Sequence, residues 1–301
     1  FNIASGTTTT ISGVIADGVS SGDVEVTGGG TLALTAANTY TGPTRVISGS
    51  TLSLSGAGSI AASSSVVNNG SLDISATTSG ASIKALTGAG AVALGAKNST
   101  LSAASGTFSG VIGGSGGVTI SGGVQTLSGV NTYTGATTVA SGATLAVSGS
   151  GSTAASSSLT NHGSVDLRGL SGNATLGGSF TQSATGNLLM SFSSAGAKSL
   201  TVAGPASLGG VLTLTPSGGR YRAGTYNLLT AGSISGAFSS VSAAFGSSVK
   251  SYSLSYTGST VDLLLMAGID AANTTSALSA NASRLRSAMD LRAAALAGMM
   301  N

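Results

Sequence analysis

The sequence of 301 residues contains no cysteine and no tryptophan, and only 6% of its residues are charged and 4% aromatic. The absence of cysteine excludes disulfides and thiolate metal sites, and it is compatible with an extracellular protein that is exported unfolded. The sequence is also too hydrophobic, at 41%, for ordinary disorder, which needs low hydrophobicity and high net charge. Because the chain has few large side chains, it cannot fill one broad core. We therefore expect a thin core that is shared among many small layers.

Charge of either sign is sparse, with 11 Lys and Arg against 8 Asp and Glu scattered along the chain. Nucleic-acid-binding proteins cluster their basic residues, because each contact with a phosphate releases a counterion. Without such a cluster, nucleic acid is not an expected partner. No apolar run approaches the length of a membrane-spanning helix, the nearest being residues 263–267. The chain starts at Phe1 without a signal peptide, so we expect a mature or excised fragment.

The sequence is rich in glycine, with 48 residues, and it contains an internal repeat. Residues 38–74 align with residues 131–167 at an offset of 93 without a gap, with 24 identities in 37 positions. Both copies begin with NTYTG, and most changes at apolar positions keep an apolar residue. Upstream, residues 11–15 resemble residues 108–112 at a slightly different offset, as in a duplicated solenoid whose turns vary in length.

Short stretches of alternating apolar and polar residues lie within the repeats, among them Thr51–Leu54 and Thr144–Val147. Gly, Ser and Asn turns bound them, which predicts strands. Such short strands cannot build a wide sandwich with so few aromatic residues. We therefore expect an all-β fold, a right-handed parallel β-helix, in which each rung bonds to the rungs above and below. With about 20 to 25 residues per rung, the offset of 93 corresponds to about four rungs.

The composition changes twice near the end of the chain. Six of the twelve aromatic residues lie between Tyr221 and Tyr256, which indicates a better packed end that protects the last edge of a solenoid. From Ile269 onward glycine almost disappears, and apolar residues recur at helical spacing at Leu278, Ala282, Leu285, Met289 and Leu296. We expect three segments: a repetitive β-helix over 1–200 (repeats at about 11–76 and 108–169), a C-terminal β-helix cap over 201–266, and a helix over 267–301.

These pieces, in this order, resemble the passenger of a Gram-negative autotransporter, the type V secretion family. The segments NTYTGPTRVISGSTLSL (38–54) and NTYTGATTVASGATLAV (131–147) resemble the passenger-associated strand repeat of that family. Residues 219–265 resemble its pertactin-like C-terminal, autochaperone region, chiefly through AGTYNLLTAGSISGAF at 223–238. The tail from Ile269 is similar to the linker helix that threads the translocator barrel.

The resemblance implies that the chain's partner is its own C-terminal outer-membrane β-barrel translocator, which this sequence does not include. It implies export of the unfolded chain across the outer membrane to the Gram-negative cell surface or the medium, with the C-terminal rungs folding first. In some members the chain is cut inside the barrel next to an asparagine. Asn301 is therefore a candidate cleavage point, and an artificial chain end is the alternative.

Two motifs with catalytic associations are interpreted as turns. The only histidine, His162 in TNHGS, has Asn69 as its counterpart in the first copy, so we expect a turn residue that tolerates positive φ. The segment 113–117 (GGSGG) matches the G-x-S-x-G nucleophile pattern, but glycines surround it and no helix follows, so we expect a loop.

Four carboxylates lie between apolar neighbours, namely Glu25, Asp73, Asp166 and Asp262. Alternation places all four outward as solubilising charges. If four rungs separate Asp73 from Asp166, about 19 Å lies between them, whereas a glycosidase pair needs roughly 5 to 9.5 Å. A lyase that uses a single Asp, Lys or Arg stays open as a minor alternative.

The sequence therefore predicts a non-catalytic passenger, a β-helical stalk of adhesin or virulence type. It predicts no catalytic residue, no metal ligand and no cofactor. The alternative is the scaffold of a secreted protease whose catalytic head lies upstream of Phe1. A third hypothesis is self-association, or binding of a host-surface ligand, through Thr and Ser ladders on flat outward faces.

Overall fold

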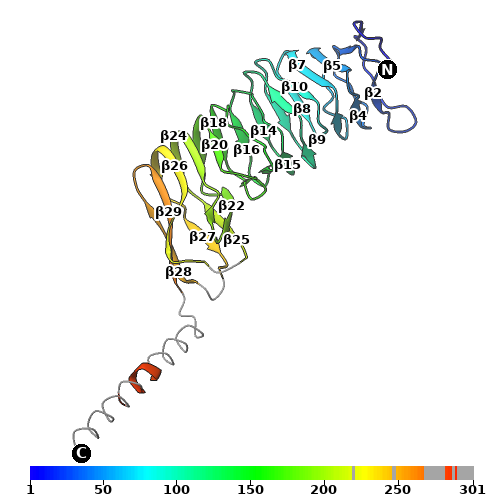
Figure 1. Cartoon of the computed structure of the whole chain (residues 1–301). Helices are drawn as coiled ribbons and strands as arrows, with labels where there is room; N and C mark the ends of the chain where they lie inside the picture. The colour runs from blue at the N-terminus through cyan, green and yellow to red at the C-terminus, as the bar shows by residue number, and fades with distance from the viewer. Residues whose placement is uncertain (219–220, 246–248, 268–281, 287–288, 290–301) are drawn as a thin grey trace, which may run out of the picture.

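The computed structural model describes residues 1–218, 221–245, 249–267, 282–286 and 289. These residues form an all-β parallel solenoid of about 10 turns, which confirms the predicted fold class. Figure 1 shows the strands stacked along one axis, with the N-terminus at one end of the stack and strands β28 (Val249–Tyr256) and β29 (Thr260–Ala267) at the other.

The strands of the first turns form two parallel sheets. The six-stranded sheet contains, in order of pairing, β1 (Thr8–Ile11), β3 (Thr31–Leu34), β5 (Thr51–Gly56), β7 (Ser71–Thr77), β10 (Ala91–Ala93) and β13 (Val111–Gly113). The four-stranded sheet contains β2 (Val24–Val26), β4 (Thr44–Val46), β6 (Val66–Asn68) and β9 (Leu86–Thr87).

Two longer sheets continue the stack. The eight-stranded sheet contains β12 (Thr107–Phe108), β15 (Val124–Leu127), β17 (Thr144–Val147), β19 (Ser164–Asp166), β22 (Asn187–Ser193), β25 (Val211–Ser217) and β27 (Ser240–Ala243), with β23 (Gly196–Ala197) on β22. The eleven-stranded sheet runs from β8 (Ala81–Ile83) through β11 (Ser99–Leu101), β14 (Val118–Ile120), β16 (Thr137–Val139), β18 (Ser158–Asn161), β21 (Ser179–Gln182), β24 (Leu200–Leu208) and β26 (Gly224–Gly236) to β29 and β28, with β20 (Ala174–Leu176) on β24.

One turn of the solenoid passes through three sides. From β6 the chain enters the six-stranded sheet as β7 and the eleven-stranded sheet as β8, and it returns beside β6 as β9. A bridge between Gly88 and Phe108 joins the four-stranded sheet to the eight-stranded one, so these two form one continuous side. Paired residues of successive turns lie about 20 positions apart, as in Thr31 with Thr51 and Thr51 with Ser71.

Columns of aliphatic side chains fill the interior. Leu32, Leu52, Leu72, Val92 and Ile112 are paired through five successive turns, and each is buried. Each side chain of the column is covered by the side chains of the turns above and below it, so every turn needs its neighbours to bury its apolar residues. Full burial of one such side chain contributes about 1.5 to 3 kcal/mol to stability. The thin, layered core expected from the composition is the one observed.

The relation between the two long repeats differs from the expectation of about four rungs. Strand β4 belongs to the four-stranded sheet, whereas its counterpart 93 residues later, β16, belongs to the eleven-stranded sheet. Likewise β5 lies in the six-stranded sheet and its counterpart β17 in the eight-stranded sheet. At about 20 residues per turn, 93 residues are not a whole number of turns. The second copy is therefore displaced by one side of the solenoid and does not lie directly above the first.

The C-terminal end of the stack has a different construction. Strand β24 pairs with β26 in parallel, but β26 pairs with β29, and β29 with β28, in antiparallel fashion. Phe192 and Phe245 pack against each other and against surrounding tyrosine rings at centroid distances of 5.0–5.5 Å. Ala267, the first residue of the expected helix, is the last residue of strand β29. Beyond it, residues 282–286 and 289 are helical, and the other expected helical positions lie outside the described residues.

Candidate functional site

The first NTYTG copy forms a buried chain of hydroxyl groups. The phenol of Tyr40, which is 1% exposed, is 2.7 Å from the hydroxyl of Thr44. Thr44 donates to the hydroxyl of Ser63 at 2.9 Å, and Ser63 donates to the carbonyl of Gly42 at 2.8 Å. The tyrosine therefore lies inside the solenoid, and its polar end is fully partnered there.

The second copy reproduces this chain. Tyr133 contacts Thr137 at 2.7 Å, Thr137 contacts Ser156 at 3.0 Å, and Ser156 donates to the carbonyl of Gly135 at 2.8 Å. Burial raises the pKa of Tyr40 and Tyr133 to about 12, although the hydrogen bond with the neighbouring threonine lowers it. Both phenols are therefore neutral at physiological pH and act as structural hydrogen-bonding groups.

The asparagine of the motif connects neighbouring turns. Asn38 accepts a hydrogen bond from the amide of Ile15 in the preceding turn at 2.9 Å and donates to the carbonyl of Ser59 in the following turn at 3.0 Å. Asn131 makes the same two bonds, with Ile112 and Ser152, at 2.9 and 3.0 Å. One side chain thus fixes three turns relative to one another.

The glycine of the motif permits close approach of the backbone. At Gly42 and at Gly135 an added Cβ atom would collide with the backbone of the turn below, at Gly22 and Gly116 respectively. Neither glycine has a positive φ. The requirement is therefore one of space and not of left-handed conformation.

The family model of the passenger-associated-transport-repeat matches residues 24–54 and 122–147, and both matched segments contain NTYTG. Repeat and fold together fit an autotransporter passenger domain. No curated protein matches the chain. The passenger family implies export to the cell surface or secretion, and linkage to a C-terminal translocator barrel.

The four carboxylates flanked by apolar residues point outward as expected, since both neighbours of each along the chain are buried. Asp166 forms an ion pair with Arg168 at 2.7 Å. Burial raises the pKa of Asp166, but the hydrogen bonds and charge of Arg168 outweigh this effect and lower the pKa overall. Asp73 and Asp166 belong to different sheets, the six-stranded and the eight-stranded one, so they do not form a pair of acids.

The other two sequence motifs lie in turns or loops. His162 is exposed in a bend beside β18, but no described residue other than glycine has a positive φ, so the expectation of positive φ at His162 and Asn69 is wrong. The neighbouring Gly163 has no room for a Cβ atom, so the turn is tight because of the glycine. Ser115, in the G-x-S-x-G match, lies in the loop between β13 and β14, and its amide and hydroxyl contact the carbonyl of Gly95.

Within the described residues, no group of three or more His, Cys, Asp and Glu side chains could hold a metal ion. In the same part of the chain, no helix has the length and apolar character needed to cross a membrane. Asn301, the candidate cleavage point, lies outside the described residues.

Sequence reasoning missed the partners of the motif, Thr44 and Ser63, and their counterparts Thr137 and Ser156. The signal was present, because both positions are identical in the two copies although Pro43 and Arg45, on either side of Thr44, change to Ala136 and Thr138. Identity at small polar positions within a varied strand indicates an inward hydroxyl with a fixed partner.

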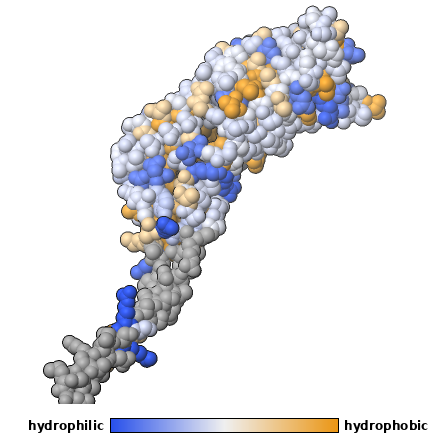
Figure 2. All heavy atoms as spheres, viewed as in Figure 1, coloured by the Kyte–Doolittle hydropathy of each residue, from blue (hydrophilic) through white to orange (hydrophobic). Residues whose placement is uncertain are grey.

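One outward row of hydroxyl groups runs through eight strands of the eleven-stranded sheet and is called here the hydroxyl column. Its members are paired from strand to strand and are Ser82, Thr100, Thr119, Thr138, Thr160, Thr181, Ser207 and Ser235. Of these eight hydroxyls, only that of Ser235 hydrogen-bonds to another described residue, at 3.5 Å. Figure 2 shows that most of the visible surface of the stack has near-neutral hydropathy, with scattered polar and apolar residues.

Proposed function

We propose that the chain is a non-catalytic stalk that associates with further copies of itself through the hydroxyl column, as an adhesin does. The observation that supports this is the register of the column, which continues without interruption through eight strands. At a strand spacing of about 4.8 Å the column is about 34 Å long.

A hydroxyl is both donor and acceptor, so a column of hydroxyls is complementary to a second copy of itself. Two chains related by a two-fold axis can form hydrogen bonds between their columns. Because the column repeats once per turn, the two chains can pair in several registers that differ by one turn. The surface available is a narrow strip, well below the roughly 800 Å² per partner of a standard interface. A single contact is therefore weak, and many copies side by side on a surface supply the strength.

The experiment is sedimentation of the purified chain over a wide concentration range. We expect reversible self-association of the native chain and its loss in the double variant Thr119→Glu/Thr138→Lys, which removes two adjacent hydroxyls from the column but keeps the pair neutral. The matched control, Thr144→Glu/Ser164→Lys, makes the same change at adjacent outward positions of the eight-stranded sheet. A strictly monomeric native chain, or equal loss in both variants, contradicts the proposal.

We further propose that the C-terminal turns, about residues 201–266, support translocation by folding first. The hairpin of β28 and β29 supports this, because its pairs, from Tyr256 with Val261 to Val249 with Ala267, are closer in sequence than the pairs of successive turns and so form at a small entropic cost. Phe245 packs on Tyr252 of this hairpin. Phe245→Ala is then expected to slow refolding, whereas Phe108→Ala, in the middle of the stack, chiefly speeds unfolding. Stopped-flow refolding in urea distinguishes the two, and equal slowing by Phe108→Ala contradicts the proposed order.

A further inference from the structure

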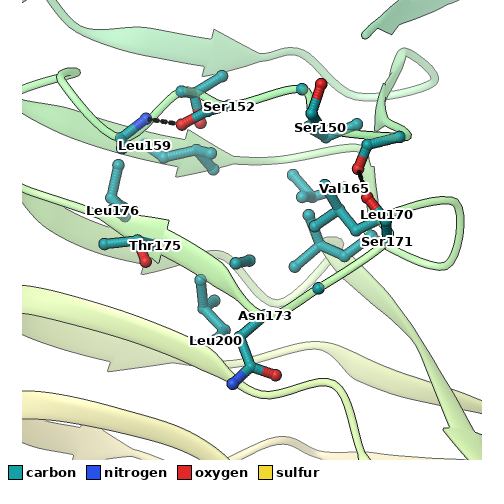
Figure 3. A pocket seen from close by; sticks show the side chains of 18 of the residues that line it. Ser150, Ser152, Leu159, Val165, Leu170, Ser171, Asn173, Thr175, Leu176 and Leu200 are labelled. Atoms are coloured by element: carbon teal, nitrogen blue, oxygen red, sulfur yellow. Dashed lines mark hydrogen bonds between the residues drawn. The ribbon is translucent and has the colours of Figure 1, made fainter. Parts of the chain in front are cut away.

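The core of the solenoid is open to the surface beside the second repeat. A cavity of about 350 Å³ lies beside the turns formed by residues 147–176, on the side of the solenoid where the six-stranded sheet has ended at β13. Two loop segments, 149–154 and 170–174, form its rim. Figure 3 shows Ser150 and Ser171 on one side of this space, Leu159 and Leu176 on the other, and Asn173 and Leu200 below.

The first repeat supplies an internal comparison, because ten of the lining residues lie within the aligned segment 131–167, and five of them have buried side chains in the core. The residues Val147, Thr153, Leu159, Val165 and Leu167 line the cavity and are 2–8% exposed; their counterparts Leu54, Ile60, Val66, Leu72 and Ile74 are 0–1% exposed. The same layer of the core is therefore sealed in the first repeat and open in the second.

All five positions differ between the copies: three of the changes make the side chain smaller in carbon content, whereas Val66 becomes the larger Leu159. Two of these three changes lie at the positions of Leu54 and Ile60. Ile60 of the first copy becomes Thr153, and Leu54 becomes Val147. Both changes remove carbon atoms from the layer, and the lining aliphatic side chains lose the contacts that these atoms supply in the first copy. The hydroxyl of Thr153, a residue that lines the cavity, has no hydrogen-bond partner among the described residues and is available to a ligand.

The lining defines the chemistry of a ligand. No charged residue lines the cavity; its inner wall is aliphatic with Phe180, and its rim carries serine and threonine hydroxyls and the amide of Asn173. Lys198 is outside the lining, and its ammonium donates to the carbonyl of Leu170. Because a buried charge without a partner is costly, the cavity favours a neutral molecule.

The volume sets the size of the ligand. An apolar cavity of about 150 Å³ accommodates benzene, so a cavity of about 350 Å³ accommodates roughly two rings. We propose that this cavity is a binding site for a small uncharged molecule with an apolar body of about two fused rings and one polar end. The apolar body lies against the aliphatic wall, and the polar end contacts Thr153 and the rim. This inference is independent of the proposed self-association.

The test uses 2-naphthol as the probe, with binding to the whole chain followed by calorimetry and naphthol fluorescence. We expect saturable binding with one site per chain. Thr153→Ile restores the residue that fills the equivalent layer in the first repeat, and it is expected to weaken binding at least tenfold. Thr126→Ile, on the outward face of β15 and outside the hydroxyl column, adds the same atoms away from the cavity and is expected to leave affinity unchanged.

Two further measurements make the result decisive. Val147→Leu, the second change toward the first repeat, is expected to weaken binding in the same direction, so the test does not rest on one variant. The carboxylate 2-naphthoate is expected to bind at least tenfold more weakly than 2-naphthol. Non-saturable binding, unchanged affinity in both filled variants, or equal affinity for naphthoate would each overturn the proposal.

Discussion

At the residue scale, NTYTG places polar side chains inside an apolar stack and provides each with a partner. Tyr40 and Tyr133 are the two largest fully buried side chains, and each is connected through a threonine and a serine to a backbone carbonyl. Asparagine and glycine complete the motif by joining turns and by permitting close approach. The motif is therefore a structural element of the solenoid and not a ligand site.

Removing one phenol tests this role. Tyr133→Phe leaves the hydroxyl of Thr137 with one partner fewer in a buried position, and we expect a loss of about 1 to 3 kcal/mol in the free energy of unfolding. Tyr40→Phe is expected to have the same effect, because its network is the same. Urea unfolding followed by circular dichroism measures both. In the double variant Tyr133→Phe/Thr137→Val, a loss equal to the sum of the single losses would show that the two groups do not interact.

The same two tyrosines predict an alkaline transition. Their pKa is about 12 in the folded chain and about 10 in an unfolded one. Because the folded-state pKa is raised, the stabilising contribution is complete below a pH of about 10 and is lost as the pH rises through about 12. Each tyrosine accounts for about 2 to 3 kcal/mol over that interval. Titration of tyrosinate absorbance checks this, and ionisation of all six tyrosines near pH 10 in a folded chain would refute it.

The sequence allowed the structural role of NTYTG to be predicted, since no acid, base or metal ligand accompanies either copy. It did not show that the tyrosines are buried, because an aromatic residue in a turn-like segment fits a surface position equally well. The positive φ expected at Asn69 and His162 is absent, since the adjacent glycine, and not the asparagine or histidine, meets the steric demand of the turn.

At the element scale, glycines set the distance between turns. Gly135→Ala places a Cβ atom against the backbone of Gly116, so the two turns must separate. We expect a loss of about 2 kcal/mol or more in stability. Gly13→Ala is the matched control, because an added Cβ atom has no neighbour within 4 Å there and φ is not positive. Equal urea midpoints for the two variants would refute the steric explanation.

The strands were predictable from alternation, whereas the side of the solenoid on which each strand lies was not. Thr51–Leu54 and Thr144–Val147 are strands as expected. They nevertheless lie in different sheets, because all three sides present the same environment to a short alternating segment. A repeat in sequence therefore does not require a repeat in spatial position. The side on which a strand lies depends on the number of residues in each preceding turn, and this number varies. Asn187 pairs with Val211, and Val211 pairs with Ser240, so the second of these turns is longer than the first.

At the scale of the whole molecule, the stack depends on contacts between neighbouring turns, so its stability is distributed along the axis. The core of the first repeat is closed and that of the second contains the cavity, so we expect stability to be uneven along the axis. We expect amide hydrogen exchange to be slower in β6 than in its counterpart β18, since Val66 is fully buried and Leu159 borders the cavity. Equal protection of the two strands, measured by mass spectrometry, would contradict this difference.

We propose that this chain is a passenger that folds as a parallel β-helix after export. The most direct measurement displays it in a Gram-negative host, between a signal peptide and an outer-membrane translocator barrel, and applies protease to intact cells. The account predicts that the chain is accessible to antibody at the surface and yields a resistant core ending near Ala267. Retention in the periplasm, or digestion of the displayed chain to small peptides, would contradict the account.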